Sequence, residues 1–154
     1  METAKLAAFR NRALDILFPP QCLCCQALVA ETGSLCSDCW QNISFIAGPC
    51  CHACGLPFEF ELGPEALCGA CAQDRPVFNR ARSVMIYNAA SRDLILSFKH
   101  GDRTHAAAAY AGWLKRSGSD LIRHSDLILP VPLHWSRLFH RRYTQAALVA
   151  IELG

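Results

Sequence analysis

Apolar residues recur at helical spacing at the start of the chain and again in its second half. Residues 3–17 place apolar side chains on one face and basic side chains elsewhere, which predicts an amphipathic helix that stops at Pro19 and Pro20. Ser91 and Thr104 are candidate N-caps of two further helices. The segments with helical spacing in the second half are residues 91–100, 104–114 and 143–153.

Two other segments have the apolar composition of strands. Residues 81–87, ARSVMIY, are predicted to form one strand, and residues 126–131, DLILPV, fit a buried strand of a parallel sheet. The order strand, helices, strand, helix is typical of the beginning of an α/β sheet. The second half of the chain is therefore predicted to form a partial α/β core.

The stretch from Cys22 to Cys71 lacks such periodicity and contains all ten cysteines. Eight of them form four C-x-x-C pairs, a spacing that brings two thiolates close enough to bind one tetrahedral ion. Four pairs supply enough ligands for two structural Zn2+ ions. The predicted ligands are Cys22, Cys25, Cys36, Cys39, Cys51, Cys54, Cys68 and Cys71.

A disulfide framework and a redox site are the alternatives to zinc. Disulfide frameworks rarely repeat C-x-x-C four times, and the sequence shows no export signal. A redox C-x-x-C motif normally occurs once, at a helix N-terminus beside a strand. Zinc is therefore favoured. Because so small a segment buries little apolar surface, the metal is expected to supply much of its folding free energy.

The spacing leaves open which pairs share a metal. Consecutive pairing gives two zinc ribbons in series, with ten residues between the pairs of the first ribbon and thirteen between those of the second. Cross-braced pairing, first with third and second with fourth, uses the same cysteines. Consecutive pairing is favoured because each half closes locally, at a small cost in loop entropy.

Four other residues in this stretch could bind a metal or a base, but each also fits an ordinary structural role. Cys24 and Cys50 belong to no pair and fit small buried fillers or spare thiols better than ligands. His52 lies inside the third pair, but four cysteines already close that site. Trp40 follows Cys39, where an indole more often covers a metal site than stacks on a base.

Length and composition narrow the class of protein only broadly. The chain has 154 residues, enough for one ordinary domain and a small one, and 52% hydrophobic with 18% charged residues indicates a folded protein. A net charge of +2 is too small to argue for nucleic acid by itself. No apolar run approaches the ~20 residues of a membrane span. Unpaired thiols without a signal peptide predict a reducing, cytoplasmic location.

Three arginines follow the second predicted strand. Arg137, Arg141 and Arg142 are suited to bind pyrophosphate or nucleic-acid phosphate, and a solvated basic face is an equally good interpretation. Lys99 falls near the end of a predicted helix, where the helix dipole favours a lysine without any further role.

From Phe18 onward the chain resembles the ComF family, also described as competence protein F or amidophosphoribosyltransferase-like. The matching motifs are FPPQCLCC, LCSDCW, CHACGLPF, CGAC, RARSVMIY, LILSFKHGD and LPVPLHWSRLFHRRYTQAALVA. The resemblance implies an N-terminal zinc-ribbon domain joined to a type I phosphoribosyltransferase fold. It also implies a role in natural transformation, with single-stranded DNA or proteins of the DNA-uptake machinery as partners. By the same resemblance, Lys99 corresponds to a position near the substrate site.

The chain departs from the family pattern in two places. It contains no D-D-x-x-T-T-G loop, the element that holds phosphoribosyl pyrophosphate and orients Mg2+ in the family, and the chain is not expected to catalyse the transfer alone. Mg2+ and phosphoribosyl pyrophosphate are thus expected only if a C-terminal segment is supplied. Thr144 stands where the family commonly has Asn, which puts any role of that amide in doubt.

These inferences combine into one hypothesis. Residues 1–20 form the amphipathic helix, 21–72 a double zinc ribbon, 73–80 a linker and 81–154 a partial phosphoribosyltransferase-like α/β domain. The predicted function is that of a ComF-like zinc-binding protein of the DNA-uptake class. The alternatives are a zinc-ribbon adaptor without a nucleic-acid role and a fragment of an active phosphoribosyltransferase.

Overall fold

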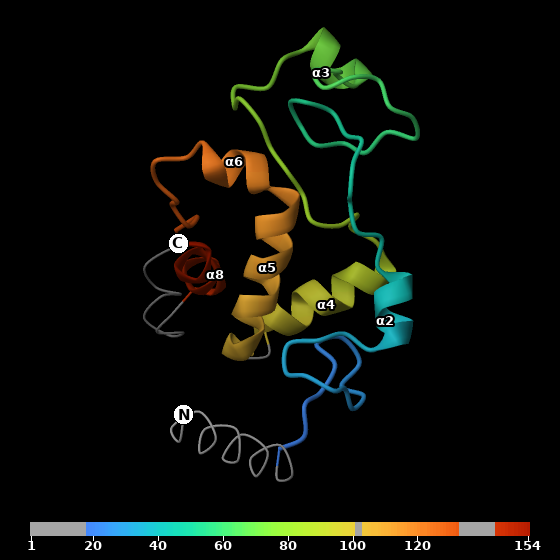
Figure 1. Cartoon of the computed structure of the whole chain (residues 1–154), viewed down its shortest axis with the longest axis vertical. Coiled ribbons are helices and arrows are strands. Elements are labelled where there is room, and N and C mark those ends of the chain that lie inside the picture. The colour runs from blue at the N-terminus through green and yellow to red at the C-terminus, as the bar shows by residue number, and fades with distance from the viewer. Residues whose placement is uncertain (1–17, 101–102, 133–143) are drawn as a thin grey trace, which may run out of the picture.

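A computed structural model describes residues 18–100, 103–132 and 144–154, and the regular structure in these ranges is helical (Figure 1). The amphipathic helix expected over 3–17 lies outside them. The elements are α2 Ser37–Asn42, α3 Gly69–Gln73, α4 Ala89–His100, the 3-10 turn η1 Thr104–Ala106, α5 Ala107–Ser117, α6 Ser119–Arg123 and α8 Gln145–Leu153.

Helix α4 matches the helix expected from residue 91, but its cap lies three residues earlier. The side-chain Oδ1 of Asn88 accepts a hydrogen bond from the Ser91 N–H (3.0 Å), and Ser91 Oγ accepts one from the Asn88 N–H (2.8 Å). This reciprocal arrangement is a capping box, in which Asn88 is the N-cap and Ser91 its partner. Ser91 as N-cap is therefore wrong: its hydroxyl is fully buried and donates to the carbonyl of Ile86.

The caps of the later helices also differ from expectation. Thr104 begins η1 and makes no capping hydrogen bond to α5, so it is not the N-cap predicted. Thr144 does cap α8, because its hydroxyl accepts a hydrogen bond from the Ala147 N–H at 2.9 Å. Thr and Asn both serve well at an N-cap, so the exchange at position 144 preserves this function. Gln145 ties α8 to the end of α4 by donating to the Lys99 carbonyl at 2.9 Å.

The two predicted strands are absent from the described residues, which contain no β-sheet. Residues 81–87 form only an isolated antiparallel bridge, Phe45 with Met85. Their partner is thus a segment that follows the first pairs of cysteines. Residues 126–131 pair with no strand in the described ranges, and Leu127, Leu129 and Val131 are 71%, 77% and 79% exposed. The reason is general, because a segment with high β-propensity forms a strand only when a neighbouring strand supplies the hydrogen bonds.

The first cysteine-rich unit, residues 20–42 (hereafter the first ribbon), shares its core with the helices. Leu23, only 2% exposed, and the adjoining Ile43 belong to one apolar cluster with Leu94 of α4, Trp113 of α5 and Val149 of α8. The Leu23 carbonyl also accepts hydrogen bonds from Ser97 Oγ (3.1 Å) and Arg103 Nη1 (3.0 Å). The first ribbon is therefore an integral part of the helical core.

The second cysteine-rich unit, residues 49–73 (the second ribbon), lies at the opposite end of the molecule with α3 (Figure 1). Its buried hydrophobic residues are three cysteines and Ala53, with only Cys54, Phe58 and Leu67 packed against them. No large apolar side chain of this unit is fully buried. A cluster this small stabilises little by hydrophobic burial.

A short segment, residues 80–82, connects the second ribbon to the helices. The Ala81 N–H donates to the Ala53 carbonyl (2.7 Å), and Arg82 Nη1 donates to the His52 carbonyl (3.1 Å). Arg80 and Arg82 both pair with Asp120 of α6, at 3.2 and 3.4 Å. Within the described residues, no helix is long and apolar enough to cross a bilayer.

Candidate metal centre

The structure brings the eight paired cysteines together as two separate groups of four. In each group, all four sulfur atoms lie within 4.8 Å of one another. The first group is Cys22, Cys25, Cys36 and Cys39, and the second is Cys51, Cys54, Cys68 and Cys71. The grouping follows consecutive pairs along the chain, as favoured from loop lengths, and is not cross-braced.

The sulfur–sulfur distances fit a tetrahedral zinc site. Cys25 Sγ and Cys36 Sγ are 3.6 Å apart, and Cys54 Sγ and Cys68 Sγ are 3.7 Å apart. A tetrahedron with Zn–S bonds of about 2.3 Å has edges of about 3.8 Å. These distances are far longer than a disulfide bond of about 2.05 Å, and all ten cysteines are free. Four thiolates in this arrangement select a soft, tetrahedral ion, for which Zn2+ is the common biological choice.

The first C-x-x-C turn is built by backbone hydrogen bonds around Cys22. Its N–H donates to the Ala27 carbonyl (2.7 Å), and its carbonyl accepts from the Gln26 N–H (3.1 Å). Gln26 has a φ of +67°, a left-handed conformation that closes the turn. The Cys36 N–H donates to Cys22 Sγ at 3.3 Å, which places the second pair of thiols over the first.

The second turn repeats this framework with different residues. The Cys51 N–H donates to the Leu56 carbonyl (2.8 Å), and the Gly55 N–H donates to the Cys51 carbonyl (3.0 Å). Gly55 takes the left-handed position with a φ of +74°. The Cys68 N–H donates to Cys51 Sγ at 3.3 Å. The equivalence shows that the two ribbons are structural repeats of one metal-binding unit.

Backbone N–H groups stabilise the thiolate form of one cysteine in each group. Burial of Cys22 raises its pKa, but N–H groups of Cys25, Cys36 and Cys24 outweigh burial and lower this pKa to about 6. The same balance holds at Cys51, where N–H groups overcome burial and bring the pKa to about 6. A hydrogen-bonded thiolate is therefore already available in each group near neutral pH.

The last cysteine of each group behaves in the opposite way. Burial and the neighbouring thiols raise the pKa of Cys39, and the same causes raise the pKa of Cys71 to about 12. Four thiolates in this space repel one another when no cation is bound, so the last proton is held tightly. A divalent ion relieves the repulsion and displaces the proton. The donor set thus fits a resident Zn2+ at both positions.

Cys24, Cys50 and His52 lie outside both groups of four sulfurs. Cys24 is half-buried, packs against the helical core and has its Sγ 4.0 Å from the Ala90 carbonyl oxygen. Cys50 lines a pocket together with Trp40 and Trp113. His52 Nδ1 lies 3.1 Å from the Pro64 carbonyl oxygen, within its own ribbon.

The described residues do not assemble the predicted phosphate-binding set. Lys99 is exposed in the last turn of α4. Arg137, Arg141 and Arg142 lie outside the described residues. The sequence reasoning missed a different basic group, Arg82 together with Arg116, which face one cavity from distant parts of the chain. The sequence feature that could have indicated a role for Arg82 is its charge within residues 81–87, a mostly apolar segment.

Comparison with known proteins agrees with this geometry. The double zinc ribbon domain family matches residues 13–72, which include both groups of cysteines. Competence protein F of Haemophilus influenzae is 28% identical over 131 residues, which cover 82% of this chain and 55% of that protein. Together these findings show that the chain is similar to a double zinc ribbon domain and, over most of its length, to Competence protein F. The ComF-like chain spans about half the length of this curated relative. No solved structure matches this chain.

Proposed function

We propose that this ComF-like chain is a zinc-stabilised protein of the DNA-uptake class, which handles single-stranded DNA in the cytoplasm. The observation that carries the proposal is the pair of four-sulfur groups with tetrahedral spacing. The DNA-uptake class comes from the relative whose name is Competence protein F. A reducing compartment would keep all ten thiols free for metal.

In this proposal both zinc ions are structural. Zn2+ bound by four cysteines has no open coordination position, so it offers no site for substrate or activated water. Its contribution is folding free energy, on the order of 10–16 kcal/mol for structural zinc in small domains. The second ribbon, with no large buried apolar side chain, depends most on that contribution.

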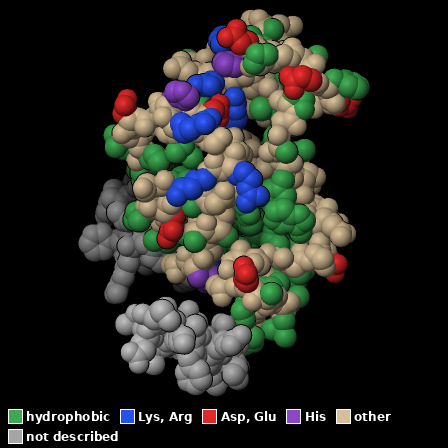
Figure 2. All heavy atoms as spheres, viewed as in Figure 1, with side chains coloured by type: hydrophobic (Ala, Val, Ile, Leu, Met, Phe, Trp, Pro, Cys, Tyr) green, Lys and Arg blue, Asp and Glu red, His purple; other side chains and the backbone are tan. Residues whose placement is uncertain are grey.

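A basic face supports the nucleic-acid part of the proposal. Figure 2 shows Lys and Arg side chains across the middle of one face, between the second ribbon and the helices. Separately, Arg82 and Arg116 line one pocket of the fold. Phosphate backbones bind such groups with release of counterions, and binding then weakens as salt rises.

Residues 81–154 are, in the same proposal, the first part of a phosphoribosyltransferase-like domain. Support comes from the resemblance and from the exposed apolar segment 126–131, which has the side chains of a buried strand but no neighbouring strand in the described ranges. Binding of Mg2+ and phosphoribosyl pyrophosphate is expected only when a C-terminal segment carrying the acidic loop is supplied. Pyrophosphate release measured with and without that segment tests this part.

The DNA-handling proposal is tested by metal content and DNA binding on the same sample. We expect a zinc-to-protein ratio near two by elemental analysis, and binding of fluorescent oligothymidylate that weakens steeply from low to physiological salt. Zinc at that ratio with no DNA binding at any salt concentration would favour the adaptor alternative and contradict the nucleic-acid role. A ratio near zero in protein that still folds would contradict the proposal as a whole.

A further inference from the structure

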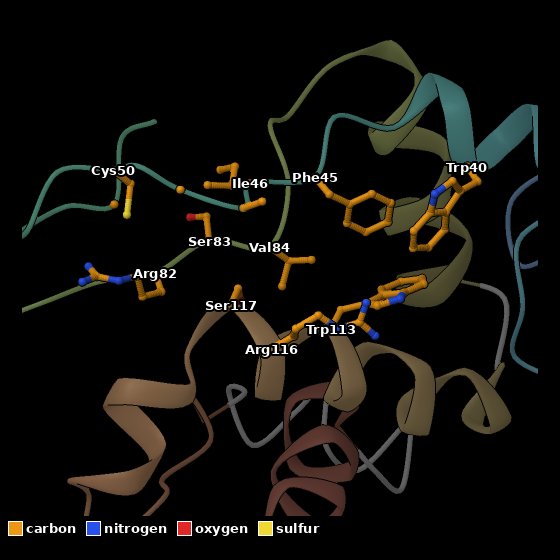
Figure 3. Close-up of a pocket in the computed structure, with 13 residues that line it drawn as sticks. Trp40, Phe45, Ile46, Cys50, Arg82, Ser83, Val84, Trp113, Arg116 and Ser117 are labelled. Atoms are coloured by element: carbon orange, nitrogen blue, oxygen red, sulfur yellow. The ribbon is translucent and has the colours of Figure 1, made fainter. Parts of the chain in front are cut away.

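A pocket of about 330 Å³ lies where the two ribbons and α5 meet (Figure 3). Its walls come from α2, from the segment between the ribbons, from residues 82–84 and from the end of α5. This volume is at the lower end of the range of about 300–1,000 Å³ for small-molecule sites. The pocket therefore has room for one ring system and a polar substituent.

One side of the pocket is aromatic. The rings of Trp40 and Phe45 lie 4.6 Å apart, and Phe45 meets Trp113 edge-on at 5.6 Å. Trp40 is 47% exposed although it belongs to this cluster, so part of its indole remains open to a further ring. Figure 3 shows the three aromatic side chains grouped at one end, with Arg82 and Cys50 at the other.

The polar groups of the pocket suit an anion. Its lining includes Arg82 and Arg116 and no acidic residue. Arg82 is already paired with Asp120 and bonded to the His52 carbonyl, whereas Arg116 forms no ion pair among the described residues. Arg116 is thus the cation whose charge is available to a ligand.

A buried hydroxyl adds a second unused group. Ser117 lines the pocket, and its Oγ is buried without a hydrogen-bond partner in the described part of the chain. A helical serine usually returns its hydroxyl to a carbonyl one turn earlier. A buried polar atom without a partner costs about 1–3 kcal/mol, which a ligand contact would relieve.

We propose that this pocket binds a single nucleotide, with the base against Trp40 and the phosphate at Arg116. Aromatic rings accept any base by stacking, and a guanidinium holds a phosphate through paired N–H groups. The nucleotide is either a free mononucleotide or one unit of a DNA single strand. The inference rests on the proposed function, to which it adds a specific site for the nucleic-acid partner.

The test uses the zinc-loaded full chain and four probes. These are dAMP, deoxyadenosine, inorganic phosphate and a short oligothymidylate, with binding followed by quenching of tryptophan fluorescence and by calorimetry. We expect dAMP or the oligonucleotide to bind more tightly than deoxyadenosine or phosphate alone, because both halves of the pocket contribute. Binding of dAMP identifies a free nucleotide as ligand, and binding of the oligonucleotide alone identifies a strand.

Matched variants separate this pocket from general basic charge. Arg116→Gln is expected to weaken binding about tenfold or more, whereas Lys115→Gln, the same charge change at an exposed neighbour outside the pocket, should change it less than about twofold. Ser117→Ala provides a second, conservative test and should weaken binding severalfold. Zinc content and far-ultraviolet circular dichroism establish that each variant is folded.

Three results would overturn the inference. The first is that neither dAMP nor the oligonucleotide binds, and the second is that phosphate alone binds as tightly as dAMP. The third is equal loss of binding in Arg116→Gln and Lys115→Gln. If the oligonucleotide binds with the usual salt dependence but both variants behave alike, the pocket is excluded while the proposed DNA-handling function stands.

Discussion

Replacing one buried ligand in each ribbon should have very unequal effects, and the pair Cys22→Ser and Cys51→Ser measures this directly. Both cysteines are fully buried, both accept a backbone N–H at 3.3 Å, and both have a pKa near 6. The two substitutions are therefore chemically matched. They differ in what each ribbon packs against.

Loss of the first site removes part of the main core. Leu23 and Ile43 are buried against the helices, and burying such side chains contributes about 1.5–3 kcal/mol each. The hydrogen bonds from Ser97 and Arg103 to the Leu23 carbonyl contribute roughly 0.5–1.5 kcal/mol apiece, and more for the charged donor. The sum is comparable to the whole stability of a small domain, about 5–15 kcal/mol. Cys22→Ser should therefore abolish the cooperative unfolding transition.

Loss of the second site should leave most of the core intact. The second ribbon is tied to the connecting segment by the bonds from Ala81 to Ala53 and from Arg82 to His52, roughly 1–3 kcal/mol in all. Its own cluster contains no large, fully buried side chain. Cys51→Ser is thus expected to unfold residues 49–73 alone, with a modest decrease in the Tm of the helices.

The assay combines zinc content, thermal melts and hydrogen exchange on both variants. Cys51→Ser should retain about one zinc, a cooperative melt and exchange protection in α4 and α5, with protection lost in the second ribbon. Cys22→Ser should lose protection throughout the described helices. Equal loss of the helical melt in the two variants would refute the reasoning that only the first ribbon shares the core.

Three further outcomes are expected. Gly55→Ala should destabilise the second ribbon, because a Cβ at this position would lie 2.8 Å from the Ala81 carbonyl oxygen. The φ of +74° also costs a non-glycine residue about 1–3 kcal/mol. Unchanged hydrogen-exchange protection in the second ribbon would contradict this expectation. Asn88→Ala should lower the unfolding free energy by about 1 kcal/mol through loss of the α4 cap, measured by denaturant melts, with Asn88→Ser close to wild type as the control. Acid should weaken zinc binding, because protons compete with the metal for the thiolates. Without metal, the pKa of Cys22 and that of Cys51 are lowered from 9.0 to about 6, so each thiolate stabilises the fold fully above about pH 9 and loses that contribution as the pH falls through 6. A chromogenic chelator should therefore remove zinc more readily as the pH is lowered from about 7 to about 4, and zinc retention that does not change over this range would contradict the assignment.

The cysteine sites were predictable because their information is local. A C-x-x-C spacing defines a turn by itself, and short loops favour consecutive pairing, which is the grouping of sulfurs in the structure. The positions of α4 and α8 followed from apolar periodicity for the same reason. The cap of α4 was predicted at the wrong residue, because Ser91 is itself a favoured N-cap residue just before the apolar face, whereas Asn88 is the residue that caps the helix.

The features that the sequence did not predict correctly depend on contacts between residues that are distant in the sequence. Residues 126–131 have strand composition, but composition does not supply a neighbouring strand. Leu23 lies between two metal ligands, outside any periodic pattern, and only the folded chain shows that it belongs to the helical core. The pocket likewise joins Trp40, Arg82 and Arg116 from three separate segments, which no local pattern would bring together.

The central claim, that two four-thiolate zinc sites organise the first half of the chain, is tested most directly by zinc K-edge X-ray absorption on the purified protein. The account predicts about two zinc ions per chain, each surrounded by four sulfur atoms at about 2.3 Å and by no nitrogen or oxygen. Zinc with mixed sulfur and nitrogen or oxygen ligands, or folded protein whose sulfur atoms are joined as disulfides, would contradict it.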